Sequence, residues 1–139
     1  VKVPDSILSK PYLRPLYDEP EFVVQNIWRL YGGWYDGNPA NLKPARDADL
    51  AKEIVQLAGS AHVVSERAKM LSEQGEHRLA CHLIELAVAA TPGDKDIHAT
   101  RAEVYKRRQK SELSLMSKGI YRYASSQSRN KLSPEKNGT

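Results

Sequence analysis

Apolar residues at helical spacing constrain this chain of 139 residues more than any other feature of its sequence. Between residues 61 and 92 they return every three or four positions along two successive segments. This spacing is typical of amphipathic helices, and the sequence shows no competing alternation of apolar and polar residues that would indicate strands. The sequence therefore predicts an all-α fold of antiparallel helix pairs.

Capping and turn residues divide this pattern into separate helices. The first helix is expected over Glu19–Tyr31, with Asp18 in position for a capping box and Gly32 and Gly33 at its end. Further helix starts are predicted at Asp47, Ser60, Asp94 or Asp96, and Ser111. Gly59 and Gly75 mark two of the helix ends.

The segment from Ala61 to Pro92 also fits a tetratricopeptide-like hairpin, in which small and large residues alternate at fixed positions. The matching positions are Ala68, Leu71, Ala80, Ile84 and Ala87 and, one period of about 34 residues later, Ala102 and Tyr105. This amounts to about one and a half repeats, and fewer than three rarely stack stably alone. We therefore expect the N-terminal helices or another chain to cover the apolar faces that this incomplete stack leaves exposed.

Composition sets the limits of the expected domain. Four prolines in residues 4–20 predict an extended arm over residues 1–18, and the polar residues 127–139 predict a disordered tail. One domain is expected over residues 1–126, with a loop rich in aromatic residues, glycine and proline over residues 32–46. No apolar run approaches the roughly 20 residues that span a bilayer, so no membrane contact is expected. The single cysteine leaves the cellular compartment open.

Histidine and cysteine offer the only candidate metal ligands. His77, Cys81 and His82 share one predicted helix, but a structural zinc ion usually has four ligands and no second cluster follows. His62 and His98 each stand alone, and no local signature of a nucleophile accompanies them. We therefore predict no catalytic residue, no metal and no cofactor in this chain.

The stretch "YGGWYDGNPANLKPA", residues 31–45, is the least ordinary part of the chain. Its aromatic residues match the composition of interfaces and substrate clefts, and its turn-forming residues should present the side chains of Asp36 and Asn38. A loop folded onto its own helices is the alternative interpretation. The choice between the two needs further information.

Residues 26–45, "NIWRLYGGWYDGNPANLKPA", resemble the signature of the alkylsulfatase dimerisation domain. Residues 73–108, "EQGEHRLACHLIELAVAATPGDKDIHATRAEVYKRR", are similar to later helices of the same domain. The resemblance implies a homodimerisation and scaffold module of an enzyme that hydrolyses alkyl sulfate esters such as dodecyl sulfate. In that family a separate metallo-β-lactamase-type domain with two zinc ions carries the chemistry, and its H-x-H-x-D-H motif is absent here. This polypeptide alone is therefore expected to have no hydrolase activity.

The resemblance also assigns expected roles to individual residues. The loop should face the catalytic domain or line the substrate entrance, and its candidate residues are Tyr31, Trp34, Tyr35, Asp36 and Asn38. Candidates for the dimer interface are Leu83, Val88, Tyr105, Met116 and Ile120.

Two other functions remain open at this point. The repeat-like helices suggest a peptide-binding adaptor, and the basic run "KRRQK" at residues 106–110 suggests nucleic-acid binding. The same run also suits the last turn of a helix, where cations are favoured by the helix dipole. Neither function accounts for the aromatic loop.

Overall fold

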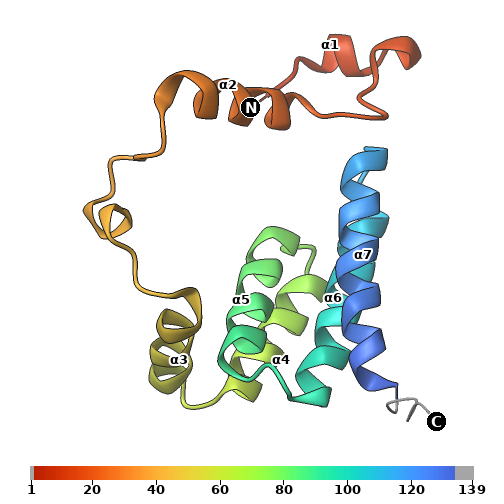
Figure 1. Cartoon of the computed structure of the whole chain (residues 1–139). Coiled ribbons are helices and arrows are strands. Elements are labelled where there is room, and N and C mark those ends of the chain that lie inside the picture. The colour runs from red at the N-terminus through yellow and green to blue at the C-terminus, as the bar shows by residue number, and fades with distance from the viewer. Residues whose placement is uncertain (1, 134–139) are drawn as a thin grey trace, which may run out of the picture. The chain divides into compact units, whose positions relative to one another are not determined.

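The computed structural model describes residues 2–133, and within that range the chain is built from helices without a strand (Figure 1). The all-α prediction is confirmed. The α-helices are α1 (Asp5–Leu8), α2 (Pro20–Gly32), α3 (Asp47–Ala58), α4 (Ala61–Glu73), α5 (His77–Ala90), α6 (Lys95–Ser111) and α7 (Leu115–Leu132). Two short 3-10 helices, η1 (Pro11–Leu13) and η2 (Pro39–Leu42), lie in the N-terminal third. None of these helices is long and apolar enough to cross a membrane.

The chain divides into two compact units rather than the single domain expected from its length. Unit 1 contains residues 2–44 and 112–118, and unit 2 contains residues 45–111 and 119–133 of the described chain. Helix α7 begins in unit 1 and continues in unit 2.

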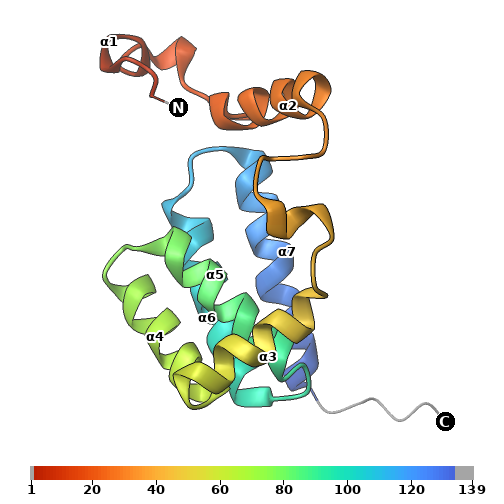
Figure 2. The same cartoon turned by 90° about the vertical axis from the view of Figure 1, so that its left-hand side faces the viewer.

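The hydrophobic core lies in unit 2, where α5 packs against α3, α4 and α6 (Figure 2). Its centre is fully buried and combines small with branched side chains, namely Ala68, Ala80, Ile84, Ala87, Ile97 and Val104. Alanine at the crossing points lets the helices approach closely, while isoleucine and valine fill the space between them. The apolar spacing of residues 61–105 thus places these side chains on the buried helix faces.

Helix α7 packs against α6 within unit 2 through small polar residues and stacked rings. The hydroxyl of the buried Ser125 donates a hydrogen bond of 2.8 Å to the carbonyl of Ala102. The rings of Tyr105 and Tyr121 stack with centroids 5.8 Å apart. The short serine side chain permits the close contact, and its hydroxyl needs a partner once it is buried.

Two of the predicted capping residues start helices as expected. The Ser60 hydroxyl accepts a hydrogen bond from the Val63 amide, and the Asp94 carboxylate accepts from the amides of Asp96 and Ile97. Asp47 is the first residue of α3, but the N-cap position belongs to Arg46 and has no side-chain hydrogen bond. The capping box predicted at Asp18 is also missing, because Glu19 holds the N-cap position of α2 without such a bond.

The predicted start of the last helix is wrong. Ser111 is the final residue of α6, and α7 begins at Leu115. Ser114 supplies the cap, because its hydroxyl accepts a hydrogen bond from the Ser117 amide. Both serines suit a cap by residue type, so the sequence did not separate them.

The N-terminal arm is partly helical, which corrects the prediction of an extended segment over residues 1–18. Pro4 and Pro11 stand at the starts of α1 and η1, where a proline ring fits the first turn of a helix. The arm is bound to the start of α7 inside unit 1. The Leu115 amide donates to the Leu16 carbonyl at 2.8 Å, and the Ser114 hydroxyl donates to the Tyr17 carbonyl at 2.8 Å.

The predicted disordered tail is also wrong in part. Residues 127–132 belong to α7, where the Ser128 hydroxyl bonds to His98 and Arg101 of α6. These tertiary contacts override a local composition that is poor in apolar residues. The rest of the tail, residues 134–139, lies outside the described residues.

Candidate interaction surface

Helix α2 exposes large apolar side chains along most of its length. None of its 13 residues is buried. Large side chains along it remain between about half and four fifths exposed, among them Val24 at 48%, Ile27 at 53%, Trp28 at 62% and Tyr31 at 82%. An apolar surface of this kind on a soluble protein marks an interaction site.

A shallow groove of about 320 Å³ runs along one side of α2 and is lined by Val24, Ile27, Trp28, Tyr31 and Gly32. We refer to Val24, Ile27, Trp28 and Tyr31 as the α2 stripe. Gly32 permits the local packing, because a Cβ atom at this position would lie 3.2 Å from the Trp28 indole. A side chain at position 32 would therefore require the Trp28 indole to shift by a few tenths of an ångström.

The loop that follows α2 is held by its own polar side chains. The Asp36 carboxylate accepts hydrogen bonds from the Asn38 amide at 2.9 Å and from Nδ2 of Asn41 at 2.6 Å. These bonds lower the pKa of Asp36, with the Asn38 amide as the largest cause. The Asn38 side-chain oxygen in turn accepts from the Ala40 amide and caps η2. Asp36 and Asn38 thus fix the turn.

The aromatic residues of the loop extend outward from this fixed turn. Trp34 is 75% exposed and Tyr35 is 41% exposed, and their rings contact each other with centroids 5.9 Å apart. Gly33 and Gly37 have positive φ angles of 76° and 90°, which only glycine adopts readily. Tyr31 differs from the other candidates, because it lies in the last turn of α2 rather than in the loop. Within unit 1 the rings of Trp34 and Tyr35 are not buried.

The five candidate interface residues occupy different environments. Tyr105 is only 8% exposed and belongs to the core of unit 2, which leaves it little surface for a partner. Leu83 and Val88 are half-buried against that core. Met116 in unit 1 and Ile120 in unit 2 are 37% and 57% exposed.

A polar network inside unit 2 connects α5, α6 and α7 around Arg101. Its guanidinium donates hydrogen bonds to the Glu85 carboxylate at 2.7 Å, to the Ala124 carbonyl at 2.8 Å and to the Ser128 hydroxyl at 3.0 Å. Arg101 also lies over the Tyr105 ring, 5.0 Å from its centroid. No sequence pattern indicated this role of Arg101, because partners 16 to 27 residues away leave no local signal.

His98 also belongs to this network, and its hydrogen-bond partners determine which ring nitrogen carries the proton. Its Nε2 atom lies 2.9 Å from the Pro92 carbonyl, an acceptor, so Nε2 carries the proton. Nδ1 then accepts from the Ser128 hydroxyl at 3.1 Å. Nε2 thus joins α6 to the turn that precedes it, and Nδ1 joins α6 to α7.

The remaining candidate ligands do not form a metal site in the described part of the chain. Among residues 2–133, no group of three or more histidine, cysteine, aspartate or glutamate side chains could hold an ion. Burial raises the pKa of the Cys81 thiol to about 11. His62 pairs with Asp94 across 3.1 Å, at the start of α6.

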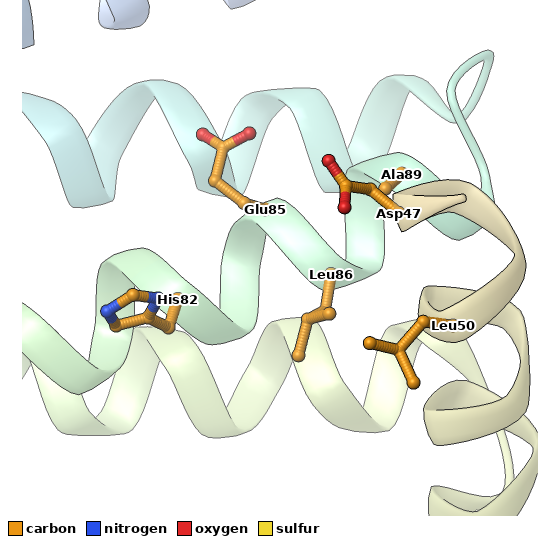
Figure 3. Close-up of a pocket in the computed structure, with 6 residues that line it drawn as sticks. All are labelled: Asp47, Leu50, His82, Glu85, Leu86 and Ala89. Carbon is orange, nitrogen blue, oxygen red and sulfur yellow. The ribbon is translucent and has the colours of Figure 1, made fainter. Parts of the chain in front are cut away.

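Figure 3 shows a second depression, of about 350 Å³, between α3 and α5. Leu50 on α3 and Leu86 on α5 supply its apolar part, and Asp47, His82, Glu85 and Ala89 complete the lining. Glu85 is already paired with Arg101 at 2.7 Å. The depression is therefore a partly apolar notch between two helices, and one of its two carboxylates, that of Glu85, is paired with Arg101.

Comparison with known proteins relates these surfaces to a family. The family model described as alkyl sulfatase dimerisation matches residues 1–131. An (R)-specific secondary-alkylsulfatase from Pseudomonas sp. is 33% identical over 102 residues, and the alkyl/aryl-sulfatase BDS1 of Saccharomyces cerevisiae is 32% identical over 94 residues. These alignments cover 73% and 68% of this chain.

A solved structure is also similar. The inverting sec-alkylsulfatase Pisa1 from Pseudomonas sp. superposes with a TM-score of 0.83 over 96% of this chain, at 28% sequence identity. The chain spans only 15% of the length of each of these two curated relatives and 21% of the solved chain. The match over residues 1–131 shows that this chain belongs to the alkyl sulfatase dimerisation family.

Proposed function

We propose that this chain self-associates as a homodimer and serves as the dimerisation and scaffold module of an alkyl sulfatase. A separate metallo-β-lactamase-type domain with two zinc ions would then hydrolyse the alkyl sulfate ester. This chain would contribute neither metal ligands nor a catalytic residue. Its role would be to hold two catalytic domains in one particle.

The observation that carries this proposal is the unequal distribution of apolar side chains between the two units. All buried apolar residues of the described chain belong to unit 2. Unit 1 holds eighteen of the large apolar side chains that are more than a third exposed, whereas unit 2 holds seven. Unit 1 contains only 50 of the 132 described residues.

Exposed apolar side chains in this number within one small unit favour association with another surface. Contiguous apolar patches on monomers rarely exceed a few hundred Å², and larger ones mark association sites. Dimer interfaces of stable homodimers are correspondingly apolar. A second copy of the chain would remove these side chains from water, in keeping with the family to which the chain belongs.

Self-association can be tested by subunit exchange. Two preparations of the chain, one with an affinity tag and one without, are mixed, diluted and captured through the tag. From an equimolar mixture that exchanges subunits at random, we expect the untagged chain to be retained at about half the amount of the tagged chain. The mixture is incubated for longer than the dissociation time of a typical interface. If only the tagged chain is then retained, the result contradicts homodimerisation.

A second part of the proposal concerns the loop over residues 31–40. We propose that Trp34 and Tyr35 face the catalytic domain and line the substrate entrance. Their support is an exposed pair of rings held by a hydrogen-bonded turn, as described for Asp36 and Asn38. Aromatic rings offer apolar area for an alkyl chain together with a polar edge.

The test requires an enzyme that contains this domain. Trp34→Ala should raise KM for long alkyl sulfates more than for short ones, because apolar contact area is lost with each methylene. Tyr35→Phe should change the same parameter if the hydroxyl binds substrate. Unchanged kinetics for both chain lengths, with unchanged stability, would remove this part of the proposal.

A further inference from the structure

We propose that the α2 stripe pairs with the same stripe of a second copy, with the two helices antiparallel across a two-fold axis between residues 27 and 28. This inference rests on the proposed self-association and names the surface that carries it. It places Val24 opposite Tyr31 of the partner subunit. It also places Ile27 opposite Trp28 of the partner subunit.

The spacing of the stripe supports this arrangement. Positions 24, 27, 28 and 31 are symmetric about the point midway between 27 and 28, and all four line the same groove. A two-fold interface uses the same patch on both copies, so a stripe that matches itself when reversed is the pattern that such an interface needs. Each contact would join a branched aliphatic side chain to a large aromatic one, which suits close packing of two helices.

The exposed area of the α2 stripe also agrees with the area that a small specific interface buries. At roughly 150–250 Å² for a whole aromatic side chain, Trp28 and Tyr31 together expose on the order of 300 Å² per copy. Two copies therefore offer about 600 Å² from these rings alone, half of the roughly 1,200 Å² that the smallest specific interfaces bury. Val24 and Ile27, which are about half exposed, add to this within the same stripe.

The first test uses a matched pair of charge substitutions on α2. Ile27→Glu would place a carboxylate at the two-fold axis, twice per dimer, and should weaken the dimer by at least about 100-fold. Asn26→Glu adds the same charge at the neighbouring position, which points away from the stripe at helical spacing, and should leave the dissociation constant within about threefold. Far-UV circular dichroism confirms that both variants keep their helices.

The second test probes the register, in a Cys81→Ala background. Val24→Cys and Tyr31→Cys chains, mixed and mildly oxidised, should form a cross-linked heterodimer. Neither variant should cross-link efficiently with itself. Residue 24 of one copy lies opposite residue 31 of the other, so the two copies of residue 24 are offset by seven residues, or about 10 Å, along the helices. The same offset separates the two copies of residue 31. Disulfide formation requires Cα atoms within roughly 7 Å.

The outcomes separate this inference from the proposed function. A wild-type chain that is dimeric, together with an equally strong Ile27→Glu dimer or self-cross-linking at position 24, would overturn the pairing of α2 and leave self-association standing. A wild-type chain that is monomeric would overturn both. Loss of the dimer in Ile27→Glu alone, with heterodimer cross-linking, is the result that the pairing predicts.

Discussion

Single arginine residues in unit 2 show that a segment rich in lysine and arginine need not form a basic surface. Arg101 is only 12% exposed in its side chain and bonds to three groups on two other helices. Arg107 pairs with Glu73 at 3.1 Å, and Arg108 lies over the Tyr121 ring. Several cations of the C-terminal third therefore hold helices together, which weakens the nucleic-acid hypothesis without testing it.

Replacing Arg101 should be costly. Arg101→Met keeps an apolar stem of similar length but leaves Glu85, the Ala124 carbonyl and Ser128 without their donor. We expect a loss of about 2–4 kcal/mol in the free energy of unfolding. Urea unfolding measures it. Arg129→Met is the control, because Arg129 is exposed and donates to Ser126 on its own helix, so its replacement should cost less than about 0.5 kcal/mol.

The Cys81 thiol provides a pH-dependent prediction. Its pKa is raised from 9.0 to about 11, mainly by burial. A folded pKa above the unfolded one means that the stabilising contribution is complete below pH 9 and is lost as the pH rises toward 11. The rate of alkylation by iodoacetamide should therefore have its midpoint near pH 11 in the folded chain and near pH 9 in urea. A folded midpoint at or below 9 would contradict the burial described for Cys81.

The sequence predicted the presence of most helices, but it predicted the residues at which they begin and end less well. The periodicity of residues 61–105 and the glycines after α3 and α4 identified the hairpins of unit 2, because those signals are local. The start of α7 was missed because Ser111 and Ser114 are equally good caps in sequence, and only the contact of Ser114 with Tyr17 decides between them. The helical residues 127–132 were missed for the same reason, since their contacts are with α6.

The cap of α4 can be tested directly. Ser60→Ala removes the acceptor of the Val63 amide and should destabilise unit 2 by about 1 kcal/mol. Ser60→Asn supplies another side-chain oxygen and should recover most of that loss. Thermal or urea unfolding of the two variants checks the prediction, and equal stabilities of the alanine and asparagine variants would refute the capping role.

The turn after α2 is a second test at this scale. Asp36→Ala deletes the acceptor of both the Asn38 amide and the Asn41 side chain, so residues 34–41 should lose their fixed conformation. We expect faster amide hydrogen exchange at Asn38, with exchange in α4 and α5 unchanged. Protection at Asn38 equal to that in the wild type would show that other contacts hold the turn.

For the whole molecule, the sequence indicated the fold class and the family but not the division into two units. Composition shows how many apolar residues a chain has, whereas their distribution between core and surface depends on the packing of distant helices. The aromatic residues 31–35 were recognised as unusual from sequence. The exposure of the whole of α2 was not, because an amphipathic helix looks the same whether its apolar face meets its own chain or another. The tetratricopeptide-like arrangement stays a prediction, as do the five interface candidates.

The most direct test of the central claim is the absolute mass of the chain in solution, by light scattering on a sizing column over a hundredfold concentration range. Self-association predicts a mass near twice 15.6 kDa that falls only at the lowest concentrations. A mass of 15.6 kDa at every concentration would contradict the account, and would mean that some other protein surface covers unit 1.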